Sequence, residues 1–188
     1  MRLWDPDLYT RTLHFAAEAH AEQKIPGTSI PYVVHLAKVC QEALSALLTD
    51  QSLNGNLVMQ CALLHDTIED THVTIEELKE HFGVEVAQGV DALSKRDISP
   101  QGKAWDASQK MRESIERIRR EPREVWVVKL ADRISNLYEP PTHWPGHKVR
   151  AYHSQAIEIR DALGEANAHL SARLTEKITN YPLPERAD

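Results

Sequence analysis

Two adjacent polar pairs stand out for their residue types and spacing: His65 with Asp66 and, one helical turn later, Glu69 with Asp70. Residues four apart share a helix face, so His65 is predicted beside Glu69 and Asp66 beside Asp70. Carboxylates this close repel one another, and a divalent cation relieves that repulsion. The alternative is a solvated helix end that carries carboxylates by chance. The apolar run 57–64, which leads into His65, predicts burial and therefore favours a metal site.

Two more candidate ligands stand among apolar neighbours elsewhere in the chain, His35 and Asp132. Taken singly, His35 would be a core histidine and Asp132 the partner of a neighbouring basic side chain. Together with His65 and Asp66 they supply two imidazoles and two carboxylates, a set suited to manganese or another first-row divalent ion. The absence of cysteine from the set argues against a closed structural zinc site. Such an ion can hold water and a phosphate oxygen, which indicates phosphoester chemistry.

Composition describes an ordinary globular protein. The 188 residues are 41% hydrophobic and 27% charged, so we expect one domain over 1–188. A net charge of −6 argues against broad nucleic-acid binding. No apolar run is long enough to span a bilayer and residues 1–7 lack a signal-peptide pattern, so we expect a cytoplasmic protein with no membrane partner. Cys40 and Cys61 are isolated and are expected to be core thiols.

Helical periodicity recurs along the chain and strand signals are nearly absent, which predicts an all-α helical bundle with the metal site in its core. A capping box begins at Thr74, and Gly83 marks a helix end. The stretch 95–109, with Pro100 and Gly102, is the least periodic and is predicted to be a mobile loop. The predicted helices cover approximately 6–23, 32–48, one segment that carries His65 to Asp70, 75–82, 84–93, 111–119, 125–137, 148–163 and 165–180.

These features resemble the HD superfamily of metal-dependent phosphohydrolases, and within it the hydrolase domain of the RelA/SpoT family. Three boxes carry the resemblance, in the family's order, over residues 16–138: Ala19-His20-x-x-Gln23-Lys24 with Pro31-Tyr32-Val33-Val34-His35, then Ala62-Leu63-Leu64-His65-Asp66-Thr67-Ile68-Glu69-Asp70-Thr71, then Lys129-Leu130-Ala131-Asp132-Arg133-Ile134-Ser135-Asn136-Leu137. With no synthetase domain expected after Asp188, the chain is similar to the free-standing small alarmone hydrolases, the metazoan SpoT homologues among them.

The resemblance implies a manganese-dependent hydrolysis of guanosine 3′-diphosphate 5′-di- or triphosphate that releases pyrophosphate and regenerates GDP or GTP. It assigns Glu69 and Asp70 to the attacking water, which they would position and deprotonate, and Asn136 to the nucleotide. The implied metal ligands are His35, His65, Asp66 and Asp132.

Base preference stays open at this point. The family usually places basic residues after the glutamine of the first box, and one of them stacks on the base. Here Lys24 is followed by Ile25, and lysine is a poorer planar stacker than arginine. An adenine 3′,5′-polyphosphate is therefore an alternative substrate, and Lys24 as a solvated loop charge is an equal alternative to Lys24 in the site.

The cations that hold the pyrophosphate are expected within 95–112, and the sequence does not choose among them. The candidates are Lys95, Arg96, Lys103, Lys110 and Arg112. The arginine cluster 117–123 is predicted to be a solvated helix end.

Two other functions compete with alarmone hydrolysis: an HD phosphohydrolase for another nucleotide, and a non-catalytic nucleotide sensor. The predicted partner is a small nucleotide, and a homo-oligomer is left open.

Overall fold

The structure, a computed structural model, describes residues 3–96, 98, 102, 104–138, 140–141 and 143–184. Every named element within those ranges is a helix, which confirms the predicted all-α fold. The α-helices are α1 (Pro6–Ala19), α2 (Val33–Ser45), α3 (Gly55–Leu64), α4 (Thr67–Asp70), α5 (Ile75–Phe82), α6 (Val84–Leu93), α7 (Ala107–Ile118), α8 (Arg123–Asn136), α9 (Gly146–Leu163) and α10 (Ala168–Asn180). Two 3₁₀ turns, η1 (Ala46–Leu48) and η2 (Gly164–Ala166), follow α2 and α9.

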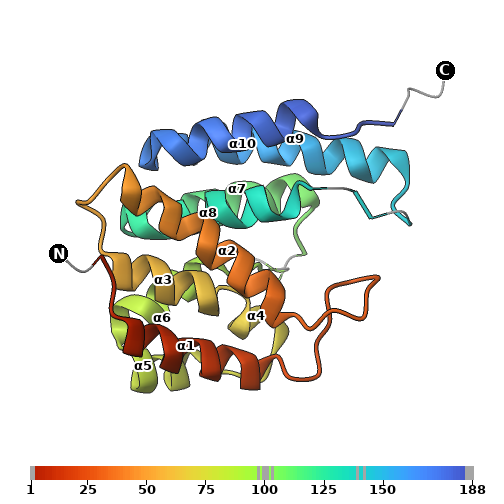
Figure 1. Cartoon of the computed structure of the whole chain (residues 1–188). Coiled ribbons are helices and arrows are strands. Elements are labelled where there is room, and N and C mark those ends of the chain that lie inside the picture. Colours follow the sequence, from red (N-terminus) through yellow and green to blue (C-terminus); the bar gives the residue numbers. More distant parts are fainter. Residues whose placement is uncertain are drawn as a thin grey trace.

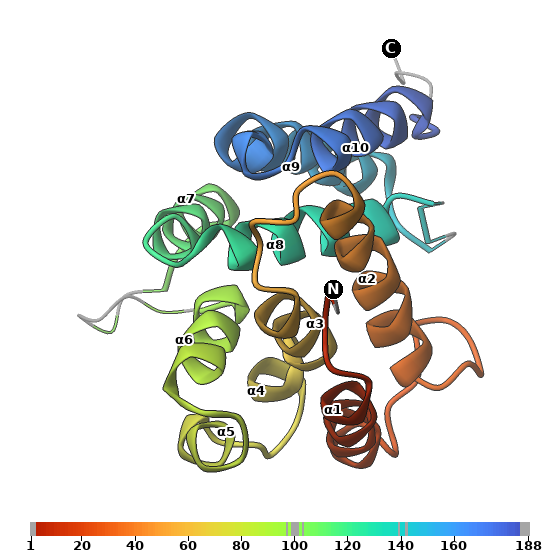
Figure 2. The ribbon, with the colours of Figure 1, turned by 60° about the vertical axis from the view of Figure 1, so that its left-hand side comes forward.

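Helix α8 lies at the centre of the arrangement, between the α9–α10 pair on one side and α2 and α3 on the other (Figures 1 and 2). Helices α1 and α5 lie on the far side of α3 and α6 from the α9–α10 pair. In α3 every residue except Asn56 is buried, as the apolar run 57–64 predicts. Burial of each large aliphatic side chain contributes about 1.5–3 kcal/mol, so α3 and α8 form the stable frame that carries the site.

Both cysteines, Cys40 in α2 and Cys61 in α3, are buried free thiols, as predicted. The capping box at Thr74 and the helix end at Gly83 are also confirmed, the glycine at φ 88°. Within the described ranges, no helix combines the length and the apolar character that a bilayer crossing requires.

Helix α7 begins earlier than predicted, at Ala107. Asp106 accepts a hydrogen bond from the Gln109 amide while the Gln109 side chain accepts one from the Asp106 amide, so a capping box starts the helix inside the predicted loop. The rest of that loop is described only at 95–96, 98, 102 and 104–106, where Ile98 and Ala104 form an isolated bridge. Its mobility stays a prediction.

The polar pairs do not share one continuous helix, which corrects the sequence prediction. Helix α3 ends at Leu64, and α4 begins at Thr67. Two side chains of the turn form hydrogen bonds with the last carbonyl groups of α3. His65 Nδ1 lies 2.9 Å from the Ala62 carbonyl oxygen, and Thr67 Oγ1 donates to the Leu64 carbonyl at 2.7 Å. These bonds compensate for the lost helical ones, so the chain can turn here and aim His65 and Asp66 inward.

Candidate metal centre and active site

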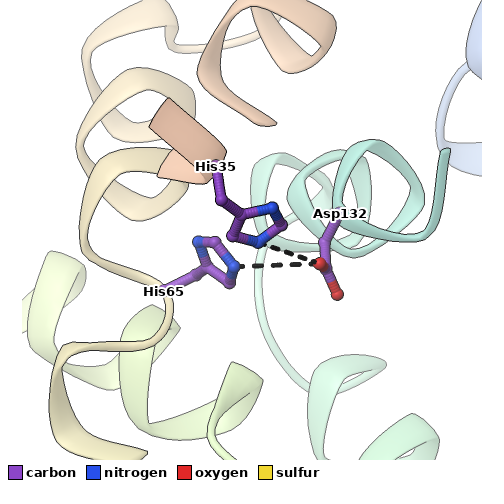
Figure 3. A group of neighbouring side chains, drawn as sticks. All are labelled: His35, His65 and Asp132. Atoms are coloured by element: carbon purple, nitrogen blue, oxygen red, sulfur yellow. Dashed lines mark ion pairs between the residues drawn. The ribbon is translucent and has the colours of Figure 1, made fainter. Parts of the chain in front are cut away.

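Three of the predicted ligands converge from three separate parts of the fold: His35 from α2, His65 from the α3–α4 turn and Asp132 from α8 (Figure 3). One ligand atom from each lies within 4.8 Å of the others. Asp132 Oδ1 is 3.7 Å from His35 Nε2 and 3.8 Å from His65 Nε2. Ligand atoms on one ion, each about 2 Å from it, lie ~3–4 Å apart, so the spacing fits a shared metal.

The orientation of His65 leaves one ring nitrogen available as a ligand. Its Nδ1 is engaged by the Ala62 carbonyl, so it carries the hydrogen, and Nε2 faces the acidic side chains. Nε2 is buried, and Asp66 Oδ2 lies 2.9 Å from it. Burial alone would lower the pKa of His65, but the charges of Asp66 and Asp132 raise that pKa to about 9. Without a metal, a proton on His65 balances these carboxylates.

Asp66, the fourth predicted ligand, lies beside the other three. Its Oδ2 is 2.9 Å from His65 Nε2 and 3.7 Å from His35 Nε2, and it accepts a 2.5 Å hydrogen bond from the Tyr32 hydroxyl. Burial and the neighbouring carboxylates, Asp66 foremost, raise the pKa of Tyr32, so its hydroxyl remains a donor. Tyr32 is a site residue that the analysis of the sequence missed, although it lies within the Pro-Tyr-x-x-His box.

Asp132 is held by two side chains of its own helix. Lys129 Nζ lies 3.4 Å from Oδ2, and Asn136 Nδ2 donates to Oδ1 at 2.6 Å. Burial would raise the pKa of Asp132, but the Lys129 and His65 charges lower it, so the carboxylate stays ionised. The ion pair with Lys129 agrees with one of the two readings of Asp132 and coexists with the ligand arrangement.

Glu69 and Asp70 have different surroundings. Glu69 lines the cavity and is fixed by Lys95, whose Nζ donates to Oε1 at 2.7 Å and whose backbone amide donates to Oε2 at 2.8 Å. Asp70 is exposed, is not among the cavity-lining residues, and accepts a 2.8 Å hydrogen bond from Gln23 Nε2.

The centre opens into a cavity of about 260 Å³, which collects basic side chains against the net charge of the chain. Of the predicted substrate contacts, Lys95, Lys110 and Asn136 line it. Lys24 and Arg96 do not: Lys24 is exposed within the α1–α2 loop, and Arg96 pairs with Asp91 at 2.8 Å. Their contact with substrate stays a prediction, and Lys103 lies outside the described residues.

Two further cavity residues, Arg133 and Tyr152, were not predicted as substrate contacts. The Arg133 guanidinium carbon lies 4.0 Å from the centre of the Tyr152 ring, and Arg133 is only 5% exposed. Among the described residues no carboxylate forms an ion pair with Arg133, and its Nε has no hydrogen-bond partner. Arg133 belongs to the third sequence box, whereas nothing in the sequence marks Tyr152, because its place depends on how α9 packs against α8.

Arg117 corrects the prediction of a solvated arginine cluster. Its side chain is only 11% exposed and donates to the carbonyl oxygens of Asp91, at 2.5 Å, and Ser94, at 2.6 Å. It also pairs with Glu113, one turn earlier in α7, at 3.0 Å. Arg117 therefore ties α7 to the end of α6, directly before Lys95.

Comparison with known proteins agrees with this geometry. Residues 12–169 match the family described as "HD domain". This chain belongs to the HD-domain family. It is 30% identical to guanosine-3′,5′-bis(diphosphate) 3′-pyrophosphohydrolase MESH1 of Xenopus tropicalis, over 90% of this chain and 92% of that protein. The mouse protein of the same name is 29% identical over 86% and 88% of the two chains.

A solved structure of this HD-domain group has the same fold. It is described as "A metazoan ortholog of SpoT hydrolyzes ppGpp and plays a role in starvation responses" and matches with a TM-score of 0.77 and 26% identity, over 96% of this chain and 98% of the other. The resemblance to the RelA/SpoT hydrolase type, drawn from the three sequence boxes, is thereby confirmed. HD-domain membership implies a divalent metal, and the buried imidazoles of His35 and His65 beside the ionised carboxylate of Asp132 fit one.

Proposed function

We propose that this protein hydrolyses guanosine 3′,5′-polyphosphates, releasing the 3′-pyrophosphate and leaving GDP or GTP. The observation that carries the proposal is the cavity, in which the candidate metal ligands meet a buried cation, Arg133, that has no carboxylate partner among the described residues. A buried guanidinium without a carboxylate partner is costly, and a phosphate ligand would offset that cost through paired hydrogen bonds. The relatives that cover most of this chain carry the name of that pyrophosphohydrolase.

In this proposal the metal is held by His35, His65, Asp66 and Asp132. The mixed nitrogen and oxygen donors favour manganese, with other first-row divalent ions as weaker alternatives. When bound, the metal would act as a Lewis acid that polarises the scissile phosphoryl group and lowers the pKa of water. The Ala62 carbonyl supports this role, because its bond to Nδ1 of His65 keeps Nε2 directed at the ion.

Glu69 accepts the proton of the attacking water in this proposal, and Asp70 helps to orient that water. Glu69 lies in the cavity wall together with His35, Asp66 and Asp132, and a general base must lie within hydrogen-bond reach of the water that it deprotonates. Lys95 fixes both oxygens of Glu69 and restricts the rotation of the carboxylate.

The substrate phosphates are held, in this proposal, by Lys110 and Arg133, and the nucleotide by Asn136 from α8. Lys129 is less available to the substrate, because it is buried beside Asp132. Tyr152 presents an aromatic ring at the same cavity, supported from one side by Arg133.

A substrate panel tests the function. Metal-stripped protein is given manganese and assayed on guanosine and adenosine 3′,5′-polyphosphates, plain nucleotides and a generic phosphodiester. We expect turnover of the 3′,5′-polyphosphates alone, with guanosine preferred. Faster turnover of the adenosine compounds would show that adenine, and not guanine, is the preferred base. Hydrolysis of plain nucleotides would indicate another branch of the HD family.

A Glu69→Gln variant separates the enzyme from a nucleotide sensor. The amide keeps the shape of the side chain but cannot accept the proton, so turnover should fall by about 10²–10⁴-fold. Manganese binding, measured by calorimetry, should be retained because Glu69 is not one of the proposed ligands. Tight nucleotide binding by a wild-type protein without turnover would contradict the enzyme proposal.

A further inference from the structure

A chain of hydrogen bonds connects His20, which follows α1, to Asp70, at the end of α4. His20 Nδ1 lies 2.5 Å from Gln23 Oε1, and Gln23 Nε2 lies 2.8 Å from Asp70 Oδ2. An ionised carboxylate only accepts hydrogen bonds, so the amide nitrogen of Gln23 must face Asp70 and the amide oxygen must face His20. That oxygen also only accepts, so His20 Nδ1 carries the hydrogen. The direction of both bonds is therefore fixed, from His20 to Asp70.

The surroundings of His20 fix its ring. His20 is 3% exposed and stacks on the Tyr32 ring, with centroids 5.1 Å apart and planes 28° apart. Its other nitrogen, Nε2, is buried without a hydrogen-bond partner among the described residues. Tyr32 in turn donates its hydroxyl hydrogen to Asp66. His20 is therefore linked to two carboxylates: to Asp70 through Gln23, and to Asp66 through Tyr32.

The backbone keeps Gln23 in place between these groups. Helix α1 ends at Ala19, earlier than predicted, and the chain turns so that the Gln23 amide donates to the His20 carbonyl at 3.0 Å. The Tyr32 amide donates to the Gln23 carbonyl, also at 3.0 Å. Because α1 ends before residue 23, this turn brings the Gln23 side chain to Asp70.

We propose that His20 is a positioning residue for hydrolysis: through Gln23 it fixes the direction of the Asp70 carboxylate. This inference rests on the proposed function, in which Asp70 orients the attacking water. Asp70 is exposed at the end of a four-residue helix, where an unrestrained side chain would sample several rotamers. His20 is not itself among the cavity-lining residues, but it stacks on one of them, Tyr32.

Two substitutions at His20 distinguish the effect of its hydrogen bond to Gln23 from the effect of its stacking on Tyr32. His20→Phe keeps a ring against Tyr32 but removes the donor to Gln23. His20→Asn keeps an N–H donor near the position of Nδ1 but removes the ring. The matched control is His153→Phe, because His153 also stacks on a tyrosine, Tyr181, at 6.3 Å; it is partly buried and contacts a backbone carbonyl, that of Ile178.

The test is a kinetic double-mutant cycle with Asp70→Asn. His20→Phe should lower kcat by about tenfold or more, since misplacement of a reacting group by about 1 Å can cost ~10²-fold, while KM and manganese affinity stay unchanged. In the Asp70→Asn background His20→Phe should cause no further loss. His20→Asn should restore most of kcat. An equal loss from His20→Phe in both backgrounds, or no greater loss than from His153→Phe, would overturn the proposal.

A second measurement does not depend on turnover. In ¹⁵N-histidine-labelled protein, the Nδ1–H proton of His20 should give a downfield resonance that disappears in Gln23→Leu and shifts in Asp70→Asn. A resonance that is unchanged in both variants would overturn the relay, even if the wild-type protein were active. A normal NMR response in a protein that hydrolyses no 3′,5′-polyphosphate would instead refute the proposed function and leave the relay as a structural link.

Discussion

The two imidazoles of the centre differ in their affinity for protons because their surroundings differ. Burial dominates at His35 and lowers its pKa, so this ring is neutral near pH 7. At His65, Asp66 and Asp132 outweigh burial and raise the pKa to about 9. In the metal-free protein at pH 7, one proton therefore occupies the ligand atom of His65, and a metal must displace it.

Manganese binding at pH 7 should release about one proton per ion. Because the pKa of His65 in the metal-free fold is about 9, manganese affinity should fall about tenfold for each pH unit below that value. Calorimetry in buffers of different ionisation enthalpy measures the release. The same titration at pH 10 is the control, and release should fall to about a tenth of a proton per ion there. Binding at pH 7 without proton release would contradict this charge assignment.

At the residue scale, the sequence predicted which candidate ligands come together better than it predicted their other partners. His35, His65 and Asp132 were predicted as one group because each has apolar neighbours in the sequence, and the structure brings them together. The pairing of Glu69 with Lys95 was not predictable, since the partners are 26 residues apart and only the packing of α4 near α6 brings them together. The roles of these residues in binding and catalysis stay predictions.

At the element scale, the ends of helices decide where the polar groups point. The spacing of the two pairs predicted one continuous helix, yet α3 stops at Leu64 because His65 and Thr67 can bond its last carbonyls. Such local competition between side chain and backbone leaves the hydrophobic pattern unchanged, so periodicity cannot detect it. In the same way, burial of Arg117 depends on the packing of α7 against α6 and is invisible in a charge-rich sequence.

Replacement of Arg117 should weaken the site from a distance. Arg117→Met removes two hydrogen bonds to carbonyls at the end of α6 and should cost about 1–3 kcal/mol in the free energy of unfolding. It should also lower kcat, because the segment that carries Lys95 loses its attachment and Glu69 becomes less restrained. Urea unfolding and steady-state kinetics check both effects. The matched control is the exposed neighbour, Arg120→Met, and equal effects of the two variants would contradict the role of Arg117.

At the scale of the whole molecule, the candidate metal centre joins elements that are far apart in sequence. Its ligand candidates come from α2, the α3–α4 turn and α8, which also pack against one another through the core. The net charge of −6 argues against broad nucleic-acid binding, which stays a prediction, and it could not show that cations gather at one cavity. The gathering of cations at the cavity, in a chain that is negative overall, depends on how α6 to α9 pack together.

Manganese should therefore stabilise the whole fold. At a free concentration one hundred times the Kd, binding adds about 2.7 kcal/mol to the free energy of unfolding. For a chain of this size each kcal/mol raises the Tm by about 2–4 °C, so the Tm should rise by roughly 5–10 °C and return after chelation. Differential scanning calorimetry measures the change, with His35→Asn as the control that should lose it. An equal rise in that variant would place the bound manganese elsewhere.

The identity of the products tests the central claim most directly. Metal-stripped protein is mixed with guanosine 3′-diphosphate 5′-diphosphate, with and without manganese, and the products are followed by ³¹P NMR. We predict equal amounts of pyrophosphate and GDP, formed only with the metal present and nearly abolished in Glu69→Gln. Orthophosphate as the first product, or no reaction in the presence of bound manganese, would contradict a 3′-pyrophosphohydrolase.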